Sequence, residues 1–279
     1  MAQPVTSLSF SAALPRLFGI AFVHGFLIRQ LAAREVEGRY RGSLLGLLWS
    51  FANPLLMLAV YTFVFGFVFE VRWGVRVGDA PIGFAAILFA GLIVHGLFSE
   101  CVMRATGLVV GNPSYVKRIV FPLDILPYVT LIAALFHAAV SLVILFIFYV
   151  ITVGLPPITA LLLPVVWAPF VLLLLGLTWG LAALGVYLRD IGQLTQPLVT
   201  VLLFLSPVFF PLTALPEAMR PWLWLNPLTL IIEETRAVLL WGRLPDWSGL
   251  ALYALIGLVV AWLGYWGFER TRRGFADVV

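Results

Sequence analysis

The sequence predicts an all-α polytopic membrane protein, and three observations lead to that prediction. Of its 279 residues, 62% are hydrophobic and only 11% are charged, whereas a soluble domain carries about 25% charged residues. The apolar residues gather in stretches long enough to cross a bilayer as helices, which takes roughly 20 residues. No polar stretch is long enough to fold as a separate soluble domain. We therefore expect one membrane domain over residues 1–279.

The first apolar run differs from the others because it is short. It covers residues 17–28, follows Arg16 and is closed by Arg29. A run of about 12 residues cannot span a bilayer, and the late first charge does not fit a cleavable signal peptide. An interfacial helix on the membrane surface is the better interpretation.

Six later stretches are long enough to span the membrane. They cover residues 44–69, 82–110, 125–153, 164–187, 191–210 and 250–268. Pro54 interrupts the first span, and Pro197 and Pro207 interrupt the fifth. Each proline removes a helical hydrogen bond, and in lipid the freed carbonyl needs a partner. These helices either face protein or a wet cavity, or they contain tolerated kinks.

The distribution of positive charge indicates that both chain ends are cytoplasmic. That orientation places eleven Lys and Arg residues in inner segments and five in outer ones, as the positive-inside rule requires. The inner set is Arg16, Arg29, Arg34, Arg39, Arg41, Lys117, Arg118, Arg189, Arg270, Arg272 and Arg273, and the outer set is Arg72, Arg76, Arg220, Arg236 and Arg243.

The segment between the fifth and sixth spans has a mixed character. Its apolar runs are too short to cross, and prolines break it repeatedly over residues 211–227. Trp222, Trp224, Trp241 and Trp247 favour the headgroup level of a bilayer. We expect two short helices that lie on the outer leaflet or dip into it as a re-entrant element.

Two charged patterns near the spans have both functional and plain interpretations. Arg34, Glu37 and Arg41 fall on one face of a helix before the first span. This stripe either follows the anionic membrane surface or simply orients that span. Glu100 and Arg104 stand four residues apart within the second span, where an unpaired charge is costly. Mutual pairing is the plainer interpretation, and a functional role is the other.

The connection at residues 111–122 predicts a short basic helix on the cytoplasmic side. Ser114 is a candidate cap, and Pro122 would stop the helix after about two turns. Lys117 and Arg118 then give the helix two positive charges. It could dock on a cytosolic partner, or it could be a surface helix of no special role.

Aromatic residues form a stripe on the first span. Tyr61, Phe65 and Phe69 recur every four residues, and Trp49 lies further inward. Flat rings can stack on sugar faces, but most aromatic side chains in membrane helices face lipid or neighbouring helices. Both interpretations stay open on the residues alone.

Several chemistries are excluded by missing motifs. Lys117, the one lysine, lies between Val116 and Arg118, so no phosphate-binding P-loop exists, and neither His-Glu-x-x-His nor Gly-x-Ser-x-Gly occurs. His24, His95 and His137 are far apart, and Cys101 is the one cysteine, so we expect no metal site. The Glu233–Glu234 pair has no His nearby in sequence to support protease chemistry. The positive charge reflects cytoplasmic loops, not a nucleic-acid partner. Energy for uphill movement must come from another subunit or from an ion gradient.

Several short sequence segments, taken in their order along the chain, resemble a known protein family. They are RYRGSLLGLLWSFANPLLM at 39–57, VYTFVFG at 60–66, VKRIVFPLDILP at 116–127, YLRDI at 187–191, LSPVFFP at 205–211, WLNPL at 224–228 and RTRRGFA at 270–276. Together they resemble the permease subunits of bacterial polysaccharide-export ABC transporters, which export O-antigen, capsule or teichoic acid. The resemblance covers nearly the whole chain.

The resemblance implies a role for each unusual segment. Residues 111–122 would form the coupling helix that seats in an ATPase, with Asn112, Ser114, Tyr115, Lys117 and Arg118 at the contact. Residues 17–41 would form an interfacial helix that brings Arg34, Arg39 and Arg41 to the same ATPase. Residues 213–245 would contain outer gate helices, with Pro211, Leu215, Trp222 and Trp224 in or beside them. The rings of Trp49, Tyr61, Phe65 and Phe69 would line the channel.

The resemblance also implies the assembly and its location. Two copies would form a homodimer above two ATP-binding cassette subunits in the bacterial inner membrane, and would move a lipid-linked polysaccharide. ATP and Mg²⁺ would be bound by the partner ATPase, and this chain would carry no cofactor and no enzymatic activity. A polytopic membrane enzyme and an ion-coupled secondary carrier are the alternatives. No catalytic constellation supports the first, and no paired intramembrane carboxylates support the second.

Overall fold

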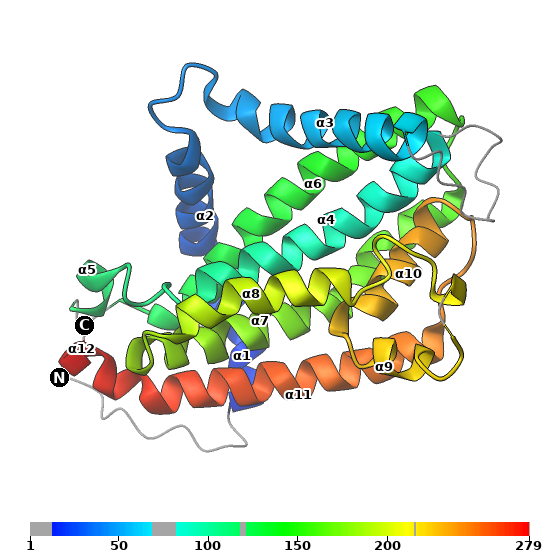
Figure 1. The fold of residues 1–279 in the computed structure, drawn as a ribbon. Coiled ribbons are helices and arrows are strands. Elements are labelled where there is room, and N and C mark those ends of the chain that lie inside the picture. Colours follow the sequence, from blue (N-terminus) through cyan, green and yellow to red (C-terminus); the bar gives the residue numbers. More distant parts are fainter. Residues whose placement is uncertain (1–12, 69–81, 118–120, 215, 279) are drawn as a thin grey trace.

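The computed structural model describes residues 13–68, 82–117, 121–214 and 216–278, and all regular structure in these ranges is helical (Figure 1). Five helical stretches there are long and apolar enough to cross a membrane, or six if the bent pair α1 and α2 is counted as one span. The long helices are α3 (Trp49–Tyr61), α4 (Ile82–Ala105), α6 (Leu126–Thr152), α7 (Leu163–Tyr187) and α11 (Trp247–Thr271). The chain is a multi-pass membrane protein, as its composition predicts.

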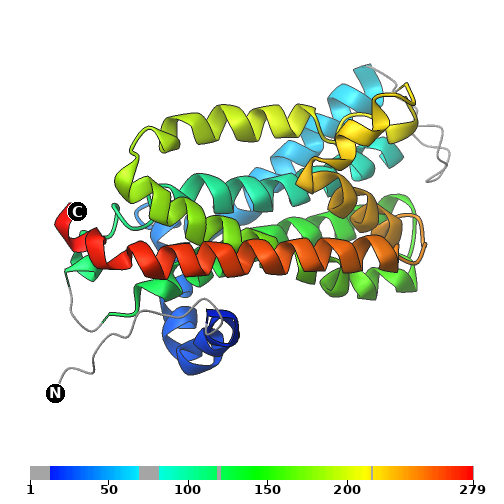
Figure 2. The ribbon, with the colours of Figure 1, turned by 90° about the horizontal axis from the view of Figure 1, so that it is seen from below.

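The N-terminal region forms two helices where the sequence predicts one interfacial helix. Helix α1 (Ala13–Val23) and helix α2 (Gly25–Tyr40) meet at His24 with a bend of 72°. Figure 1 shows α2 crossing the ends of the long helices instead of running parallel to them, and Figure 2 shows α1 and α2 to one side of the bundle. Helix α2 buries a narrow apolar face made of Ile28, Ala32 and Val36. An orientation across the bundle agrees with a helix that follows the membrane surface.

Two of the expected spans, the third and the fourth, match helices α6 and α7 closely, and the other four differ in length or regularity. The first continues from α3 into a π-helical stretch, η3 (Thr62–Val68), and the second ends at Ala105, before turns that lead to Gly111. The sixth is longer than predicted.

The fifth predicted span is shorter than expected. Helix α8 (Ile191–Phe204) has 14 residues, about 21 Å at 1.5 Å per residue, against roughly 30 Å of hydrocarbon. The chain leaves the helix at Leu205 because the Pro207 and Val208 carbonyls turn toward Arg236.

The core is built around α4, which has 72% of its candidate span buried. Helices α7 and α11 pack side by side at very short range, and glycine makes this possible. A Cβ atom built on Gly176 would lie 2.4 Å from the backbone nitrogen of Ala261, and one on Gly264 would lie 2.1 Å from the carbonyl oxygen of Gly176. Small residues at such a seam let two membrane helices approach closely.

The segment between α8 and α11 lies at the opposite end of the bundle from α5 (Pro113–Val116) and α12 (Phe275–Val278), as Figure 1 shows. It contains η6 (Leu212–Ala214), α9 (Arg220–Trp224) and α10 (Pro227–Leu239). The Asn226 side chain accepts a hydrogen bond from the Leu228 amide and donates one to the Leu202 carbonyl, so it caps α10 and ties it to α8. Helix α10 is largely buried against α4 and α7. The predicted short helices are present as α9 and α10, and their position at the outer leaflet stays a prediction.

The start of α11 is fixed by a side-chain cap just outside the span. Asp246 accepts hydrogen bonds from the Ser248 amide at 3.0 Å and from the Ser248 hydroxyl at 2.5 Å. The Ser248 hydroxyl, with help from nearby amides, holds the pKa of Asp246 below its usual range. A charged cap at a helix N-terminus is favourable because it also opposes the helix dipole.

Candidate functional site

A groove of about 280 Å³ lies between α3, α4 and α6. Pro54 and Tyr61 line it from α3, which favours the interpretation that this proline-containing helix faces a cavity over that of a tolerated kink. Its polar lining includes Glu100 from α4 together with His137 and Ser141 from α6. The rest of the lining is mostly apolar. The groove therefore combines an aromatic ring, hydroxyl groups and a carboxylate along one path beside the first span.

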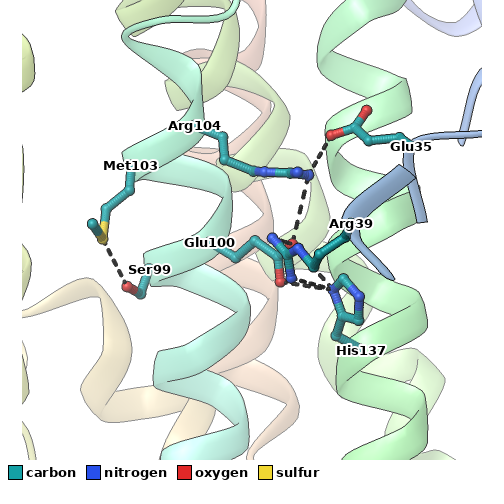
Figure 3. A network of polar contacts seen from close by, with 7 residues as sticks. All are labelled: Glu35, Arg39, Ser99, Glu100, Met103, Arg104 and His137. Carbon is teal, nitrogen blue, oxygen red and sulfur yellow. Dashed lines mark hydrogen bonds and ion pairs between the residues drawn. The ribbon is translucent and has the colours of Figure 1, made fainter. Parts of the chain in front are cut away.

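Two residues that line this groove, Glu100 and His137, belong to a group of ionisable side chains from three helices (Figure 3). We call it the α2–α4 cluster: Glu35 and Arg39 from α2, Glu100 and Arg104 from α4, and His137 from α6. Arg39 Nη2 donates to Glu100 Oε1 at 2.8 Å, and His137 Nδ1 lies 3.0 Å from Glu100 Oε2. Arg104 donates to Glu35 and lies 3.6 Å from Glu100. Glu100 is thus the shared acceptor of the cluster.

The cluster includes the predicted pair of Glu100 and Arg104, but each of the two side chains has a closer partner on α2. Their contact at 3.6 Å is longer than those that either residue makes with α2. Arg39, which the family resemblance places at an ATPase contact, points instead toward Glu100 and His137. Burial raises the pKa of the Glu35 carboxyl on the surface helix, and the Arg104 charge opposes that rise.

Two members of this cluster, Glu35 and His137, were not predicted from the sequence, and His137 is the more distant from the other members along the chain. It lies 37 positions from Glu100 and 98 positions from Arg39, so no local spacing connects them. The register of α6 against α2 and α4 brings the three together. That register is a property of helix packing and leaves no motif in the chain.

The predicted channel residues have different surroundings. Tyr61 lines the groove, whereas the Phe65 ring packs against Phe84 of α4 with centroids 5.6 Å apart. Trp49 is 39% exposed at the start of α3, and Phe69 lies outside the described residues. The stripe is therefore divided: Tyr61 faces an open space, and Phe65 contributes to packing between α3 and α4.

The predicted coupling segment contains a helix shorter than expected. Helix α5 covers Pro113–Val116, with Lys117 in a following turn and Arg118 outside the described residues. Ser114 is not its cap: Asn112 occupies that position, and its side-chain amide donates to the Leu108 carbonyl. Pro113 starts the helix instead, because its fixed φ suits the first helical position.

Contacts around α5 join it to the C-terminal end of the chain. The Tyr115 ring stacks on Phe121 with centroids 4.3 Å apart, and Arg272 Nη2 donates to the Phe121 carbonyl at 3.1 Å. Tyr187 donates to the Thr271 carbonyl, which ties α7 to the same end. Lys117 is exposed on this end of the molecule.

Arg34 and Arg41 surround a second cavity of about 610 Å³ where α2 leads into α3. Both side chains are exposed. Helix α2 ends at Tyr40, so Arg41 follows the helix and does not continue the predicted stripe in helical geometry. The cavity nevertheless brings the two arginines and Glu37 to one place.

The predicted outer gate residues lie at the far end of the bundle. Trp222 is 72% exposed and Trp224 is more than half exposed, whereas Pro211 is half-buried. Leu215 lies outside the described residues. The exposed indole rings agree with a position at the headgroup level.

Arg236 is buried, although the charge count placed it in an outer loop. Its side chain is 0% exposed and donates to the carbonyls of Ile87, Pro207 and Val208, and to Glu233. These partners belong to α4, to the turn after α8 and to α10. The acidic pair at Glu233–Glu234 is thus partly explained by structure, because Glu233 balances a buried guanidinium.

Within the described ranges, no group of three His, Cys, Asp or Glu side chains could hold a metal ion.

A family model described as ABC-2 type transporter matches residues 27–240. The chain belongs to the ABC-2 type transporter family. The match includes nearly all of α2, the α2–α4 cluster, α5 and all of α10.

Curated relatives align with this chain over most of its length. It is 30% identical to the O-antigen export system permease protein RfbA of Myxococcus xanthus over 91% of this chain and 95% of the relative. It is 22% identical to a protein of the same name from Klebsiella pneumoniae, with the same coverage. It is 25% identical to the polysialic acid transport protein KpsM of Escherichia coli over 88% of this chain and 93% of the relative.

Proposed function

We propose that this chain is the membrane-spanning subunit of an ATP-driven exporter that moves a lipid-linked polysaccharide across the bacterial inner membrane. The observation that carries the proposal is the family match, together with relatives named for O-antigen export and polysialic acid transport. Both names describe movement of a polysaccharide. Family membership favours an exporter over a membrane enzyme or an ion-coupled carrier.

The proposed energy source is a partner ATPase. This sequence has no P-loop, so ATP and Mg²⁺ would be held by a separate ATP-binding cassette subunit. The end of the molecule that carries α5, Lys117 and the C-terminal α12 is the surface we assign to that partner. Arg34 and Arg41 on the α2 side would extend the same contact.

The proposed homodimer is supported by the poorly covered first span. Only 11% of the candidate span Gly46–Phe65 is buried, against 72% for the span of α4. Helix α8 leaves Leu194, Leu198 and Phe204 exposed as well. A second copy placed against these helices would cover the exposed surface of α3 and α8 with protein, and twofold symmetry is the commonest arrangement of two identical subunits.

The proposed path for the polysaccharide runs beside α3. A hydroxyl-rich polymer cannot cross hydrocarbon unaided, because its polar groups would lose their hydrogen bonds. Tyr61 could stack on a sugar face, the Ser141 hydroxyl could donate or accept hydrogen bonds, and the Glu100 carboxylate could accept them. The exposed indoles of Trp222 and Trp224 would then flank the exit at the outer end.

The deciding experiment is co-purification with a candidate ATPase encoded beside this chain, followed by reconstitution and chemical analysis of the retained glycolipid. We expect a complex of two permeases and two ATPases that hydrolyses ATP and retains a lipid-linked polysaccharide. The purified chain alone should not hydrolyse ATP. A chain that stays monomeric and binds no ATPase in its native membrane would contradict the proposal.

A further inference from the structure

The α2–α4 cluster joins five ionisable side chains from three helices, and neither the family match nor the names of the relatives assign it a role. We propose that it is a releasable lock, which holds α2 against α4 and α6 at rest and opens when the partner ATPase displaces α2. This inference deepens the proposed function and rests on it for the source of the displacement.

The chemistry of the contacts fits release. Arg39 and Arg104 keep 37% and 30% of their side-chain surface exposed. Ion pairs that water can reach are individually weak, because solvent screens their attraction and can replace each partner. Arg236 shows the opposite design in the same chain, since it is fully buried and its acceptors include three backbone carbonyls. The ion pairs of the cluster can therefore be broken and re-formed, whereas the buried hydrogen bonds of Arg236 are too costly to break during a transport cycle.

The backbone on both sides of α2 fits movement of this helix. At its start the chain bends by 72° at His24. At its end the helix gives way to an irregular stretch in which Gly42 has φ of +85° and Gly46 has φ of +48°. Nothing lies within 4 Å of a Cβ atom placed on Gly25, Gly38 or Gly42. Two deformable junctions thus flank a helix that is not confined at its glycines.

The apolar contact beneath α2 is narrow. Ile28, Ala32 and Val36 are its buried residues, spaced along one face of four turns, and Leu27 and Leu31 pack partly buried against the same core. This stripe orients the helix and supplies part of what holds it in place. The charged contacts of Glu35 and Arg39 lie beside this stripe, so they add directly to what keeps α2 in place.

Release of α2 would also affect the groove, because the cluster and the groove share residues. Glu100 and His137 belong both to the cluster and to the lining of the groove beside Tyr61. Displacing α2 removes Arg39 from Glu100 and so changes the charge at that part of the groove. Movement of a surface helix is thereby connected to the path that we assign to the polysaccharide.

The holding role can be tested on the chain without transport. In a Cys101→Ala background, Val36→Cys reports whether the buried face of α2 is covered, through its reaction rate with a water-soluble maleimide. We expect Arg39→Gln and Glu100→Gln each to raise that rate by roughly fivefold, as the loss of an ion pair worth about 1 kcal/mol would. The double variant should raise the rate by less than the product of the two single increases, because the two residues share the contact between Arg39 and Glu100.

Arg29→Gln is the matched control, since Arg29 is an exposed arginine on the same helix. Its rate should equal that of the parent. An unchanged Val36→Cys rate in both cluster variants would overturn the lock.

The release step is tested with the cluster intact, so a poorly folded variant cannot decide the outcome. In the purified permease–ATPase complex that carries Val36→Cys, the maleimide rate is compared without nucleotide and with a non-hydrolysable ATP analogue. We expect the analogue to raise the rate by roughly fivefold. A rate that does not respond to nucleotide would overturn release. A complex that carries no polysaccharide would instead contradict the proposed function, and the rates measured without transport would still judge the holding role.

Discussion

At the scale of single residues, burial and partner type decide what each charge does. Arg236 and Arg39 have the same side chain, yet one is fully enclosed among carbonyls and the other shares a carboxylate at the surface. The first arrangement is strongly destabilising to break, because it leaves buried polar groups without partners. The second can be exchanged for water at small cost.

We predict that Arg236→Gln destabilises the protein by about 3–5 kcal/mol, since it leaves Glu233 and three buried carbonyls without their donor. The stability of Arg236→Lys should lie between those of the parent and of Arg236→Gln, because lysine keeps the charge but loses the fork geometry of the guanidinium. The measurement is thermal unfolding in detergent. Arg189→Gln, at an exposed position, is the control and should change stability by less than about 0.5 kcal/mol. Equal melting of all variants would show that Arg236 is not an anchor.

Tyr61 offers a second test at this scale, directed at the groove. Tyr61→Ala should slow polysaccharide export by reconstituted complexes without reducing the yield of assembled complex, because the ring lines the groove and is not buried in the core. Tyr61→Phe should retain most of the rate if the ring acts by stacking. Phe65→Ala is expected to lower stability as well, since it removes the contact with Phe84. An unchanged export rate in Tyr61→Ala would return this residue to a packing role.

At the scale of helices, the closest pairing is between α7 and α11. The two backbones approach so closely at Gly176 and Gly264 that an added Cβ would overlap the opposite chain. Within α11 itself Gly267 has nothing within 4 Å of a Cβ position. The same residue type therefore serves a packing purpose at one position and none at another, only three residues away.

This difference gives a matched prediction. Gly264→Ala should lower the unfolding temperature, with a cost of about 1–3 kcal/mol for overpacking, because the obstacle is backbone that cannot move aside. Gly267→Ala should be neutral or stabilising by up to about 1 kcal/mol, since alanine is the better helix former. Thermal unfolding of the two variants side by side decides it. Two variants with the same unfolding temperature would show that the seam between α7 and α11 tolerates a wider spacing.

At the scale of the whole molecule, the sequence predicts the elements better than it predicts what they contact. Long apolar runs identify α4, α6, α7 and α11 because hydrocarbon demands an uninterrupted helix. The length of α8 could not be read in this way, because its apolar run continues past Phe204 into a turn that Arg236 stabilises from another helix. His137 was missed for the same reason. Contacts between helices depend on their register, which a single sequence does not display.

The two ends of the bundle differ in a way that permits a last prediction about the assembled exporter. One end carries α5 with the exposed Lys117, the C-terminal helix and the α2–α4 cluster, and the other carries α9 with its exposed indoles. If an ATPase binds the first end through positive charge, Lys117→Glu with Arg118→Glu should sharply reduce the ATPase recovered with the permease. Insertion in the membrane should be unaffected, because neither residue lies in a span.

The control for this prediction is Arg243→Glu, a charge reversal at an exposed position in the segment between α10 and α11. It should leave ATPase recovery unchanged if the partner binds the opposite end, as proposed. The measurement is the ratio of ATPase to permease after affinity purification at fixed salt, because screening weakens contacts between exposed charges. If Arg243→Glu reduces ATPase recovery and Lys117→Glu with Arg118→Glu does not, the ATPase binds the end of the bundle that carries Trp222 and Trp224. The orientation proposed for every loop, both chain ends included, would then have to be inverted.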